Sequence, residues 1–449
     1  MKHNFGAGPC ILPQDVFKEA AEAVLDFNGL SILEVSHRHK DFVAVMDEAM
    51  ALTKKALNIP DGYSVAFLQG GATLGFTIAA LNMMRDTKRA GYMNTGTWAS
   101  GAIKEAKKVG VSVDVFASSE DRNFTYIPKN YQIPTDVDYI HFTSNNTIYG
   151  TQFQDFPKTA LPLVCDMSSD IFSKEINVAD FDLIYAGAQK NLGPAGATLY
   201  IVKDEILGKS TSTFMPTYLD LKQQIDKESM LNTPPVFSVY VAMLNLRNLI
   251  ANGGVKDMEA RNNAKSALLY AEIDRNSQFR GAVEREDRSH MNITFLLEDE
   301  TRASIFDAMW KEAGIVGLPG HRSVGGYRAS MYNAFGALTA PVYCTKIASK
   351  LIRTYTDRHG LKNLLQELLD VDVSKQQQSS DWGADSLSNA QLEYAASDVL
   401  YLHRLRNVLN ERLIRESRLE MAQACFDFLP MRAQLDLAGW PETDIFAHS

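Results

Sequence analysis

A lysine directly after an apolar strand is the first residue of this sequence that could do chemistry. The segment "AGAQKNLGPAG" (186–196) follows the apolar run "DLIYA", so Lys190 is expected at a strand end among small residues. Small residues let the backbone approach a ligand closely, and a lysine with a lowered pKa can act as a nucleophile toward a carbonyl group. Lys190 is therefore the candidate nucleophile. A surface lysine in a glycine-rich turn explains this short pattern better when it is taken alone.

Two further segments would place a carboxylate and a phosphate site at the same edge of a sheet. The run "LPLVCD" ends at Asp166, and "LQGGATLGF" (68–76) leads from a strand through two glycines into a helix. A carboxylate there can pair with the protonated pyridine nitrogen of pyridoxal 5′-phosphate (PLP), and free N–H groups at a helix start can bind its phosphate. Taken singly, Asp166 is as well explained as a helix cap, and the glycine pair as a tight connection.

Composition and charge restrict the class of protein. The chain has 449 residues, 45% of them hydrophobic, which is enough for two or three folded units. Its 45 basic and 54 acidic residues give no positive surface for nucleic acid or an anionic membrane, so small-molecule chemistry is expected. The four cysteines include no CxxC pair, which predicts neither a zinc site nor a disulfide framework. Because no run of about 18 apolar residues occurs, we expect a cytoplasmic protein that does not enter membranes.

Strand-like and helical segments alternate over the first half of the chain. Strands are expected at 63–68, 111–116, 138–142, 161–166, 182–187 and 197–202. This alternation predicts an α/β fold with a mainly parallel sheet covered by helices, in which ligands bind beyond the carboxyl ends of the strands. A long helix at 236–254 and a second, smaller α/β region at 256–334 should follow. After Pro341 almost only helical segments are expected.

Seven segments between residue 4 and about residue 334 together resemble one enzyme family. They are "NFGAGPCILP", "SILEVSHRHKDF", "NTGTWASGAIKEAK", "SNNTIYGTQF", "AGAQKNLGPAGATL", "NTPPVFSVY" and "GLPGHRSVGGYRASMYNA". In this order they are similar to the phosphoserine aminotransferases, which have the PLP-dependent transferase fold of type I. The resemblance implies a large PLP-binding domain over 16–255 and a small domain formed by 1–15 and 256–334.

The resemblance also implies which residues contact the cofactor. Lys190 would bind PLP covalently and move a proton during the reaction, while Asp166 would pair with the pyridinium and Trp98 would stack on the ring. The other contacts would come from Ala72, Thr73, Thr147 and Gln189, and from Asn232 and Thr233 of the neighbouring subunit in a homodimer with shared active sites. Many family members have arginine in place of Thr73, so only its backbone N–H is assigned a role.

Cationic residues within the same motifs imply the substrates. Arg328 would bind the α-carboxylate as a bidentate fork. The phosphate or the distal carboxylate would be bound by His37, Arg38, His321 and Arg322. The implied reaction converts 3-phosphohydroxypyruvate and L-glutamate into O-phospho-L-serine and 2-oxoglutarate in serine biosynthesis, and an additional role in pyridoxine biosynthesis stays open. His39 departs from the family pattern, since many relatives have glycine there.

The chain after about residue 335 resembles a different family. The segments "APVYCTKIASKLIRTYTDRHGLKNLLQELL" and "LEYAASDVLYLHRLRNVL" are similar to the C-terminal half of ribonuclease D, a 3′ to 5′ exoribonuclease. The family motif Tyr-x-x-x-Asp would fall on Tyr394 and Asp398, one helical turn apart. The upstream acidic motifs that complete a two-metal site are missing, and 337–449 contains 12 basic against 15 acidic residues. A vestigial nuclease fragment that holds no metal and does not bind nucleic acid is therefore expected.

The junction between the two resemblances leaves three hypotheses. The leading one is a PLP-dependent aminotransferase with a non-catalytic helical appendage at 335–449. The alternatives are an RNA-processing or RNA-binding protein whose tail is the functional part, and an inert fusion with impaired activity. The aminotransferases continue after "RASMYNA" with a closing helix, which this chain lacks. The run 345–355, with Ile347, Leu351 and Tyr355 at i, i+4 and i+8, is expected to replace part of that helix.

Overall fold

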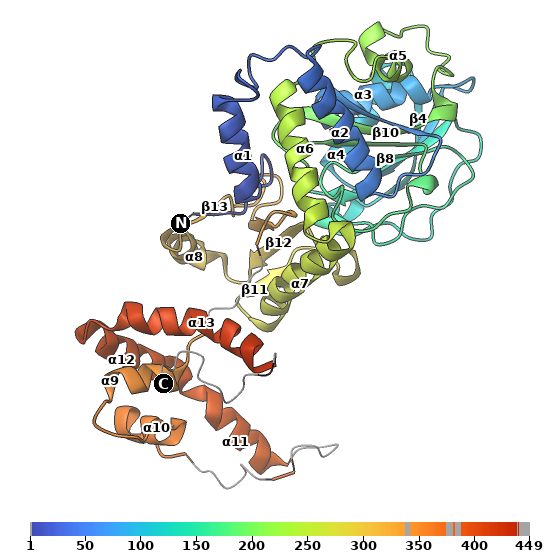
Figure 1. Ribbon diagram of the computed structural model, residues 1–449. Coiled ribbons are helices and arrows are strands. Elements are labelled where there is room, and N and C mark those ends of the chain that lie inside the picture. Colours follow the sequence, from blue (N-terminus) through green and yellow to red (C-terminus); the bar gives the residue numbers. More distant parts are fainter. Residues whose placement is uncertain (1, 337–341, 374–379, 382–387, 438, 440–449) are drawn as a thin grey trace. The chain divides into compact units, whose positions relative to one another are not determined.

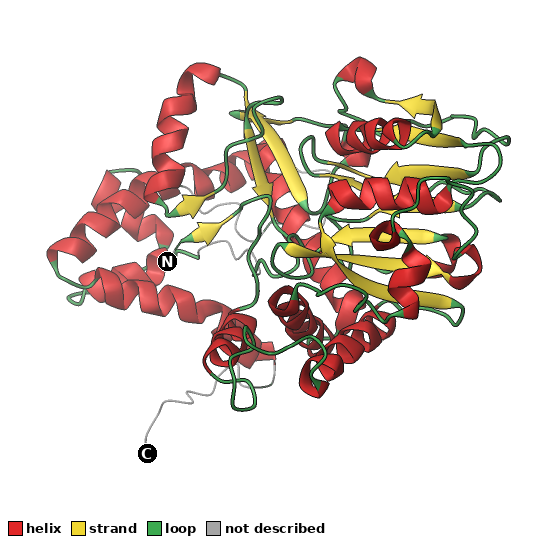
Figure 2. Ribbon diagram, turned by 90° about the horizontal axis from the view of Figure 1, so that it is seen from above, coloured by secondary structure: helices red, strands yellow, loops and turns green. Residues whose placement is uncertain are grey.

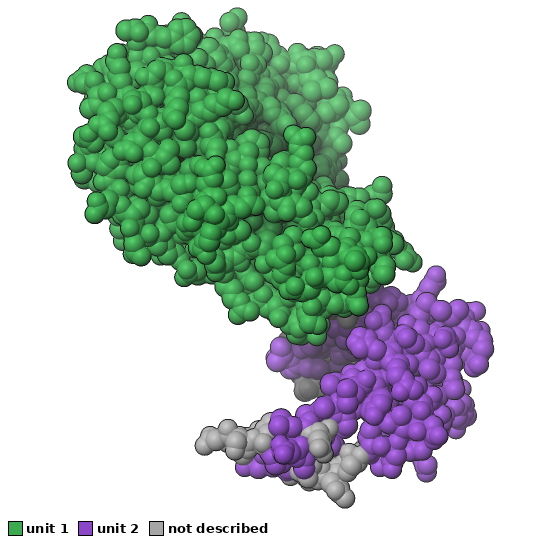
Figure 3. All heavy atoms as spheres, turned by 180° about the vertical axis from the view of Figure 1, so that it is seen from behind, with its two compact units in different colours: residues 1–338 green, residues 339–449 purple. Residues whose placement is uncertain are grey.

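The chain divides into two compact units, which are drawn as ribbons in Figure 1 and in separate colours in Figure 3. The computed structural model describes residues 2–336, 342–373, 380–381, 388–437 and 439. The first unit is Met1–Leu338 and the second is Thr339–Ser449. The finer division of the first unit into 16–255 and the segments 1–15 and 256–334 stays a prediction from the sequence.

A seven-stranded sheet forms the centre of the first unit (Figure 2). Its strand order is β2-β10-β9-β8-β5-β3-β4, and every neighbouring pair that does not include β10 is parallel. The strands are β2 (Tyr63–Gly70), β3 (Arg89–Asn94), β4 (Ser112–Ser118), β5 (Tyr139–Thr143), β8 (Leu163–Asp166), β9 (Leu183–Gly187) and β10 (Gly196–Lys203). The predicted mainly parallel sheet is confirmed. Strand β3 was missing from the prediction because its short sequence, "RAGYMN", has little β-branched character.

Helices cover both faces of this sheet (Figure 1). Successive strand residues point to opposite faces, so Phe67 lies in one hydrophobic core while its neighbours Ala66 and Leu68 lie in the other. The core that contains Phe67 is closed by α1 (Gln14–Leu25), α2 (Lys40–Ala56) and α6 (Val236–Ala251). The opposite core is closed by α3 (Ala72–Met83), α4 (Thr97–Lys108) and α5 (Leu221–Asp226). Both faces of the sheet are therefore buried, and a ligand can reach the sheet at the carboxyl ends of its strands.

A smaller α/β region completes the first unit. Its antiparallel sheet has the order β11-β12-β14 and its N-terminal strand β1 pairs in parallel with β13. The elements are β1 (His3–Asn4), α7 (Gly254–Arg275), β11 (Phe279–Gly281), β12 (Asn292–Leu297), α8 (Ala303–Glu312), β13 (Ile315–Val316) and β14 (Tyr327–Ser330). Buried aromatic residues such as Phe295, Trp310 and Tyr327 form its separate core. A short hairpin, β6 (Asn145–Asn146) with β7 (Thr151–Gln152), follows β5.

The second unit is helical where the structure describes it, as the sequence predicts. Its helices are α9 (Thr345–Ile352), α10 (Leu361–Leu369), α11 (Asn389–Leu400), α12 (Leu402–Arg415) and α13 (Leu419–Leu437). Leucines of α10 and α12 fill its core, and the buried Arg353 forms an ion pair with Glu367. The prediction that 345–355 replaces a closing helix of the first unit is wrong. Ile347 and Leu351 pack into the second unit's own core, and Tyr355 lies beyond the end of α9, 70% exposed.

Candidate active site

A cavity of about 340 Å³ opens where several strands of the large sheet end. It collects residues from the ends of β2, β5, β8 and β9 together with residues of the smaller α/β region. Nine of the residues predicted to contact cofactor or substrate line it: Ala72, Thr73, Trp98, Thr147, Asp166, Gln189, Lys190, His321 and Arg328. The carboxyl edge of a parallel sheet thus brings together side chains that are far apart in the sequence.

Lys190 lies three residues beyond β9, inside this cavity. Its Nζ is 2.8 Å from Thr147 Oγ1 and 5.8 Å from the centroid of the Trp98 ring. Desolvation lowers the pKa of Lys190 to about 8, with the charge of Arg328 acting in the same direction and that of Asp166 opposing it. A lysine with this pKa is partly in the neutral amine form at neutral pH. A nucleophile or a general base requires this form.

Covalent attachment of PLP to the apoprotein is expected to become faster as the pH rises, with a midpoint near 8. The neutral amine is the reactive form, and a pKa lowered to about 8 places its formation in this range. Stopped-flow visible absorbance at a series of pH values measures the attachment rate. A rate that keeps rising to the ordinary lysine pKa of about 10.4 would contradict the assigned environment of Lys190.

Asp166 is the last residue of β8 and is 3% exposed. The backbone N–H of Ser168 donates a hydrogen bond to Asp166 Oδ1 at 2.9 Å. Burial raises the pKa of Asp166, while the hydrogen bonds of Ser168 and the charge of Lys190 act against this rise. A buried carboxylate of this kind is stabilised by a cationic partner within hydrogen-bonding distance, and a pyridinium nitrogen is such a partner.

The glycine-rich turn between β2 and α3 supplies backbone donors to the same cavity. Gly70 has φ +127°, a conformation that favours glycine, and Gly71 is the N-cap of α3 without a side-chain cap. Gly71, Ala72 and Thr73 line the cavity, so the first turn of α3 faces the space next to Lys190. Free N–H groups and the positive end of a helix bind phosphate at such turns.

Arg328 enters the cavity from β14 of the smaller sheet. Its Nη1 donates a hydrogen bond to the carbonyl oxygen of Thr147 at 3.0 Å, whereas its Nε is buried without a hydrogen-bond partner in the described part of the chain. Desolvation lowers the pKa of Arg328. An unsatisfied guanidinium donor in a cavity is suited to a carboxylate ligand, which would supply the missing acceptor.

Five of the predicted site residues do not line this cavity within the described chain: His37, Arg38, Asn232, Thr233 and Arg322. Asn232 and Thr233 are exposed and contact Gln69, which donates a hydrogen bond to the carbonyl oxygen of Thr233 at 2.6 Å. Arg38 and Arg322 are exposed. The roles predicted for all five residues stay predictions. This includes the roles of Asn232 and Thr233, which require a neighbouring subunit.

Residues that the sequence reasoning missed connect the two parts of the site. Asn145 lines the cavity, and its Nδ2 donates hydrogen bonds to Ser169 Oγ and to Asn292 Oδ1, both at 2.8 Å. Asn292 on β12 in turn donates to Ser330 Oγ, two residues from Arg328. This buried network joins the large sheet to the strand that carries Arg328. The run "SNNTIYG" contains Asn145, but nothing in the sequence pairs it with a residue 147 positions away.

Comparisons with known proteins identify the family. The family model described as "Aminotransferase class-V" matches residues 3–337. The phosphoserine aminotransferase of Flavobacterium johnsoniae is 60% identical over 336 residues, which cover 74% of this chain and 94% of that protein. This chain belongs to the phosphoserine aminotransferase family. The resemblance inferred from its motifs is therefore confirmed.

Solved structures of this family support the same assignment. The phosphoserine aminotransferase from Bacillus circulans subsp. alkalophilus is 42% identical with a TM-score of 0.72, over 75% of this chain and 94% of that one. The PLP-bound phosphoserine aminotransferase from Trichomonas vaginalis is 32% identical with a TM-score of 0.71, over 75% of this chain and 96% of that one. The chain is a PLP-dependent aminotransferase, and PLP is its cofactor.

The residues present fit this cofactor. Asp166 is buried and forms no ion pair within the described part of the chain, and Lys190 and the donors of the β2–α3 turn line the same cavity. Asp166 would hold the pyridine nitrogen, Lys190 the reactive carbon, and the turn the phosphate. When bound, PLP withdraws electrons from the α-carbon of the substrate, which makes the proton there easier to remove.

A second family model, described as "3'-5' exonuclease", matches residues 328–414. Tyr394 lies on α11 with a half-buried side chain, and the side chain of Asp398 lies outside the described residues. No group of three or more His, Cys, Asp or Glu among the described residues could hold a metal ion. No helix in the described part of the chain is long and apolar enough to cross a membrane.

Proposed function

We propose that the chain transfers the amino group of L-glutamate to 3-phosphohydroxypyruvate, giving O-phospho-L-serine and 2-oxoglutarate. The observation that carries this proposal is one cavity that contains Lys190, Asp166 and the unsatisfied guanidinium of Arg328. The first two residues suit PLP chemistry, and the third suits a substrate carboxylate. The reaction named for the family relatives, which cover most of the first unit, supports the choice of substrates.

The side chains of the cavity have separate roles in this reaction. Lys190 Nζ, with its pKa lowered to about 8, removes the proton from the α-carbon of the bound amino acid and returns a proton later in the cycle. Thr147 contacts both Lys190 and, through its carbonyl oxygen, Arg328. It therefore sets the distance between the proton acceptor and the substrate carboxylate.

The phosphate of the substrate needs additional cations. His321 lines the cavity, with its Nδ1 2.7 Å from Ser323 Oγ, and we assign phosphate or distal carboxylate binding to it together with Arg322, His37 and Arg38. Arg38 and Arg322 are exposed, which leaves their side chains free to turn toward a substrate. This assignment rests on the family motifs and on charge, since arginine side chains attract a doubly charged anion.

A homodimer with shared active sites is part of the proposal, because Asn232 and Thr233 lie outside the cavity of their own chain. Mixing Lys190→Ala protein with the double variant Asn232→Ala, Thr233→Ala tests this sharing directly. If the sites are shared, a hybrid dimer has one site with both changes and one intact site, so activity returns on mixing. If each chain builds its own site, mixing restores nothing.

The activity itself is tested with the full chain loaded with PLP. Glutamate alone should convert the visible absorption of the bound cofactor to that of its amino form, and 3-phosphohydroxypyruvate should reverse the change. A chain that binds no PLP and elutes as aggregate would favour the alternative of an inert fusion. Turnover of other keto acids but not of 3-phosphohydroxypyruvate would contradict the proposed substrate. Running the same assay with 4-phosphohydroxythreonine tests the further role in pyridoxine biosynthesis.

Substituting Arg328 by glutamine is expected to raise the KM for glutamate by roughly 10- to 100-fold, the range given by losing a charge-assisted hydrogen bond of about 1.5–3 kcal/mol. The effect should be larger on KM than on kcat, because Arg328 binds the carboxylate and not the reacting carbon. Steady-state kinetics of the full reaction at saturating 3-phosphohydroxypyruvate measure both constants. Arg280→Gln is the matched control, since Arg280 is exposed, lies in the same sheet region, and pairs with Glu298. A fall in kcat with an unchanged KM would contradict this role.

A further inference from the structure

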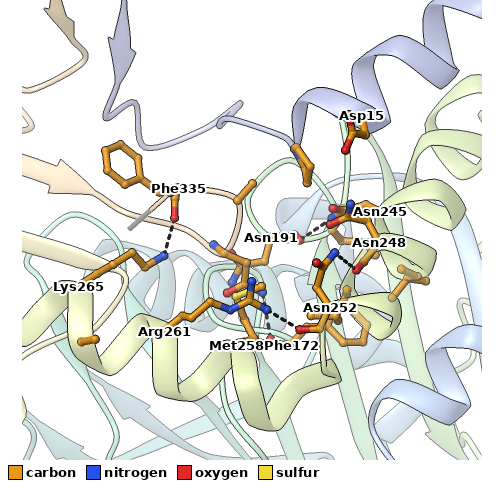
Figure 4. Close-up of a pocket in the computed structure, with 18 residues that line it drawn as sticks. Asp15, Phe172, Asn191, Asn245, Asn248, Asn252, Met258, Arg261, Lys265 and Phe335 are labelled. Atoms are coloured by element: carbon orange, nitrogen blue, oxygen red, sulfur yellow. Dashed lines mark hydrogen bonds between the residues drawn. The ribbon is translucent and has the colours of Figure 1, made fainter. Parts of the chain in front are cut away.

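A second cavity, of about 380 Å³, lies in the first unit, and Asn191, the residue after Lys190, is part of its lining (Figure 4). Its walls come from the start of α1, from α6 and α7, from Asn191 and Leu192, and from 333–336. None of its lining residues lines the active-site cavity. Its volume is within the range of about 300–1,000 Å³ that is typical of small-molecule sites.

Two cations on α7 face this cavity without a counter-ion. Lys265 is 3% exposed, and Arg261 precedes it by one helical turn (Figure 4). Within the described residues neither side chain forms an ion pair, and Arg261 Nη2 donates to the carbonyl oxygen of Asn252 at 2.9 Å. The acidic residue that lines the cavity, Asp15, is exposed and pairs with Lys18 at 3.2 Å. The cavity therefore has an excess of positive charge.

Within the described chain, Lys265 Nζ contacts three backbone carbonyl oxygens and no carboxylate. Its Nζ donates to the carbonyl oxygens of Tyr332 at 3.0 Å and Phe335 at 3.1 Å, and lies 3.5 Å from that of Met331. Carbonyl dipoles do not neutralise an ammonium group, and desolvation with the nearby charge of Arg261 lowers the pKa of Lys265 to about 8. An anion next to Nζ would offset this cost, and the donor on the longest contact can turn toward it.

The remaining walls are partly apolar and partly amide. Phe172, Leu249 and Met258 are buried side chains along the cavity, and Asn245 and Asn248 contribute amide groups from α6. Inorganic ions gain nothing from apolar walls, whereas a ligand with a hydrocarbon body buries surface against them. The cavity thus combines two cationic side chains with buried apolar side chains.

We propose that this cavity binds a small organic carboxylate with an apolar body. The carboxylate accepts hydrogen bonds from Lys265 and Arg261, and the apolar body packs against Phe172, Leu249 and Met258. The cavity also adjoins the loop that carries Lys190. Asn191 and Leu192 of this loop line the cavity, and Asn245 Nδ2 donates hydrogen bonds to their backbone carbonyl oxygens at 3.0 and 2.9 Å.

The proposal is tested by calorimetric titration of the full, PLP-loaded chain with phenylacetate, using phenylacetamide as the neutral probe of the same shape. Phenylacetate should bind at least about tenfold more tightly than the amide, the size expected when one charge-assisted contact is lost. Arg328→Gln removes the carboxylate site in the active-site cavity, and binding to the second cavity should survive in that variant. Binding that disappears with Arg328→Gln would overturn the proposal.

Two variants locate the bound carboxylate. Lys265→Met removes the charge and should weaken phenylacetate at least about tenfold in the Arg328→Gln background. Because Lys265 also contacts the carbonyl groups of 331–335, Ala264→Phe provides a second test that fills the cavity and keeps both cations. Its matched control is Ala260→Phe, an exposed position on the same helix that does not line the cavity. Unchanged phenylacetate affinity in Ala264→Phe, or an equal loss in Ala260→Phe, would overturn the assignment to this cavity.

Discussion

Replacing Lys190 with alanine is expected to lower kcat by about 10⁴-fold, the upper end of what one proton-transferring group contributes. The loss should be this large because Lys190 both anchors the cofactor and moves the α-proton, and no other amine lines the active-site cavity in the described chain. Single-turnover kinetics with glutamate, followed by visible absorbance, measure the rate of the first half-reaction. The variant should still bind PLP through its phosphate and ring contacts.

The control for this variant is Lys222→Ala. Lys222 is exposed and pairs with Asp226 at 2.8 Å on α5, away from the cavity, so its loss should leave kcat unchanged. An added primary amine should restore part of the activity of Lys190→Ala if the missing function is proton transfer, while it cannot restore a misfolded protein. A Lys190→Ala protein that retains a tenth or more of the activity would show that another group removes the proton.

The main parts of the active site were predictable because each follows a strand. Lys190, Asp166 and the glycine pair of the β2–α3 turn stand just after apolar runs, and a parallel sheet brings the carboxyl ends of its strands to one edge. Arg328 was predicted from family motifs alone. Its position next to Thr147 depends on a contact across 181 residues, which no local pattern contains.

Buried polar residues outside the strand ends could not be predicted in the same way. Asn145 and Asn292 are polar residues whose burial depends on the contact between the β6–β7 hairpin and the small sheet. Lys265 stands in the sequence "EARNNAKSALLY", which is typical of a solvent-facing helix. Carbonyl groups more than 60 positions away bury it. The sequence indicated where two families meet near residue 335. It did not indicate that Ile347 and Leu351 pack into the core of the second unit.

Substituting Asp166 by asparagine should lower the activity of the protein while it raises the stability of the apoprotein. The change keeps the shape and removes the charge, so a pyridinium nitrogen loses its partner. We expect kcat to fall by about 10²- to 10³-fold, as for other preorganised electrostatic groups. Visible absorbance on addition of glutamate should show a correspondingly slow conversion of the cofactor.

The stability of the apoprotein should change in the opposite direction. Burial raises the pKa of Asp166 in the folded state above its unfolded value, so the charged carboxylate is less stable in the fold than in the unfolded chain. The folded apoprotein accordingly loses stability as the pH rises through the folded pKa, and asparagine removes this loss. At neutral pH the Tm of Asp166→Asn apoprotein should exceed that of the original chain, and the difference should shrink as the pH falls toward 4. A lower Tm of Asp166→Asn at every pH would show that the charged carboxylate stabilises the folded apoprotein. It would contradict the view that the buried charge destabilises the apoprotein until the cofactor binds.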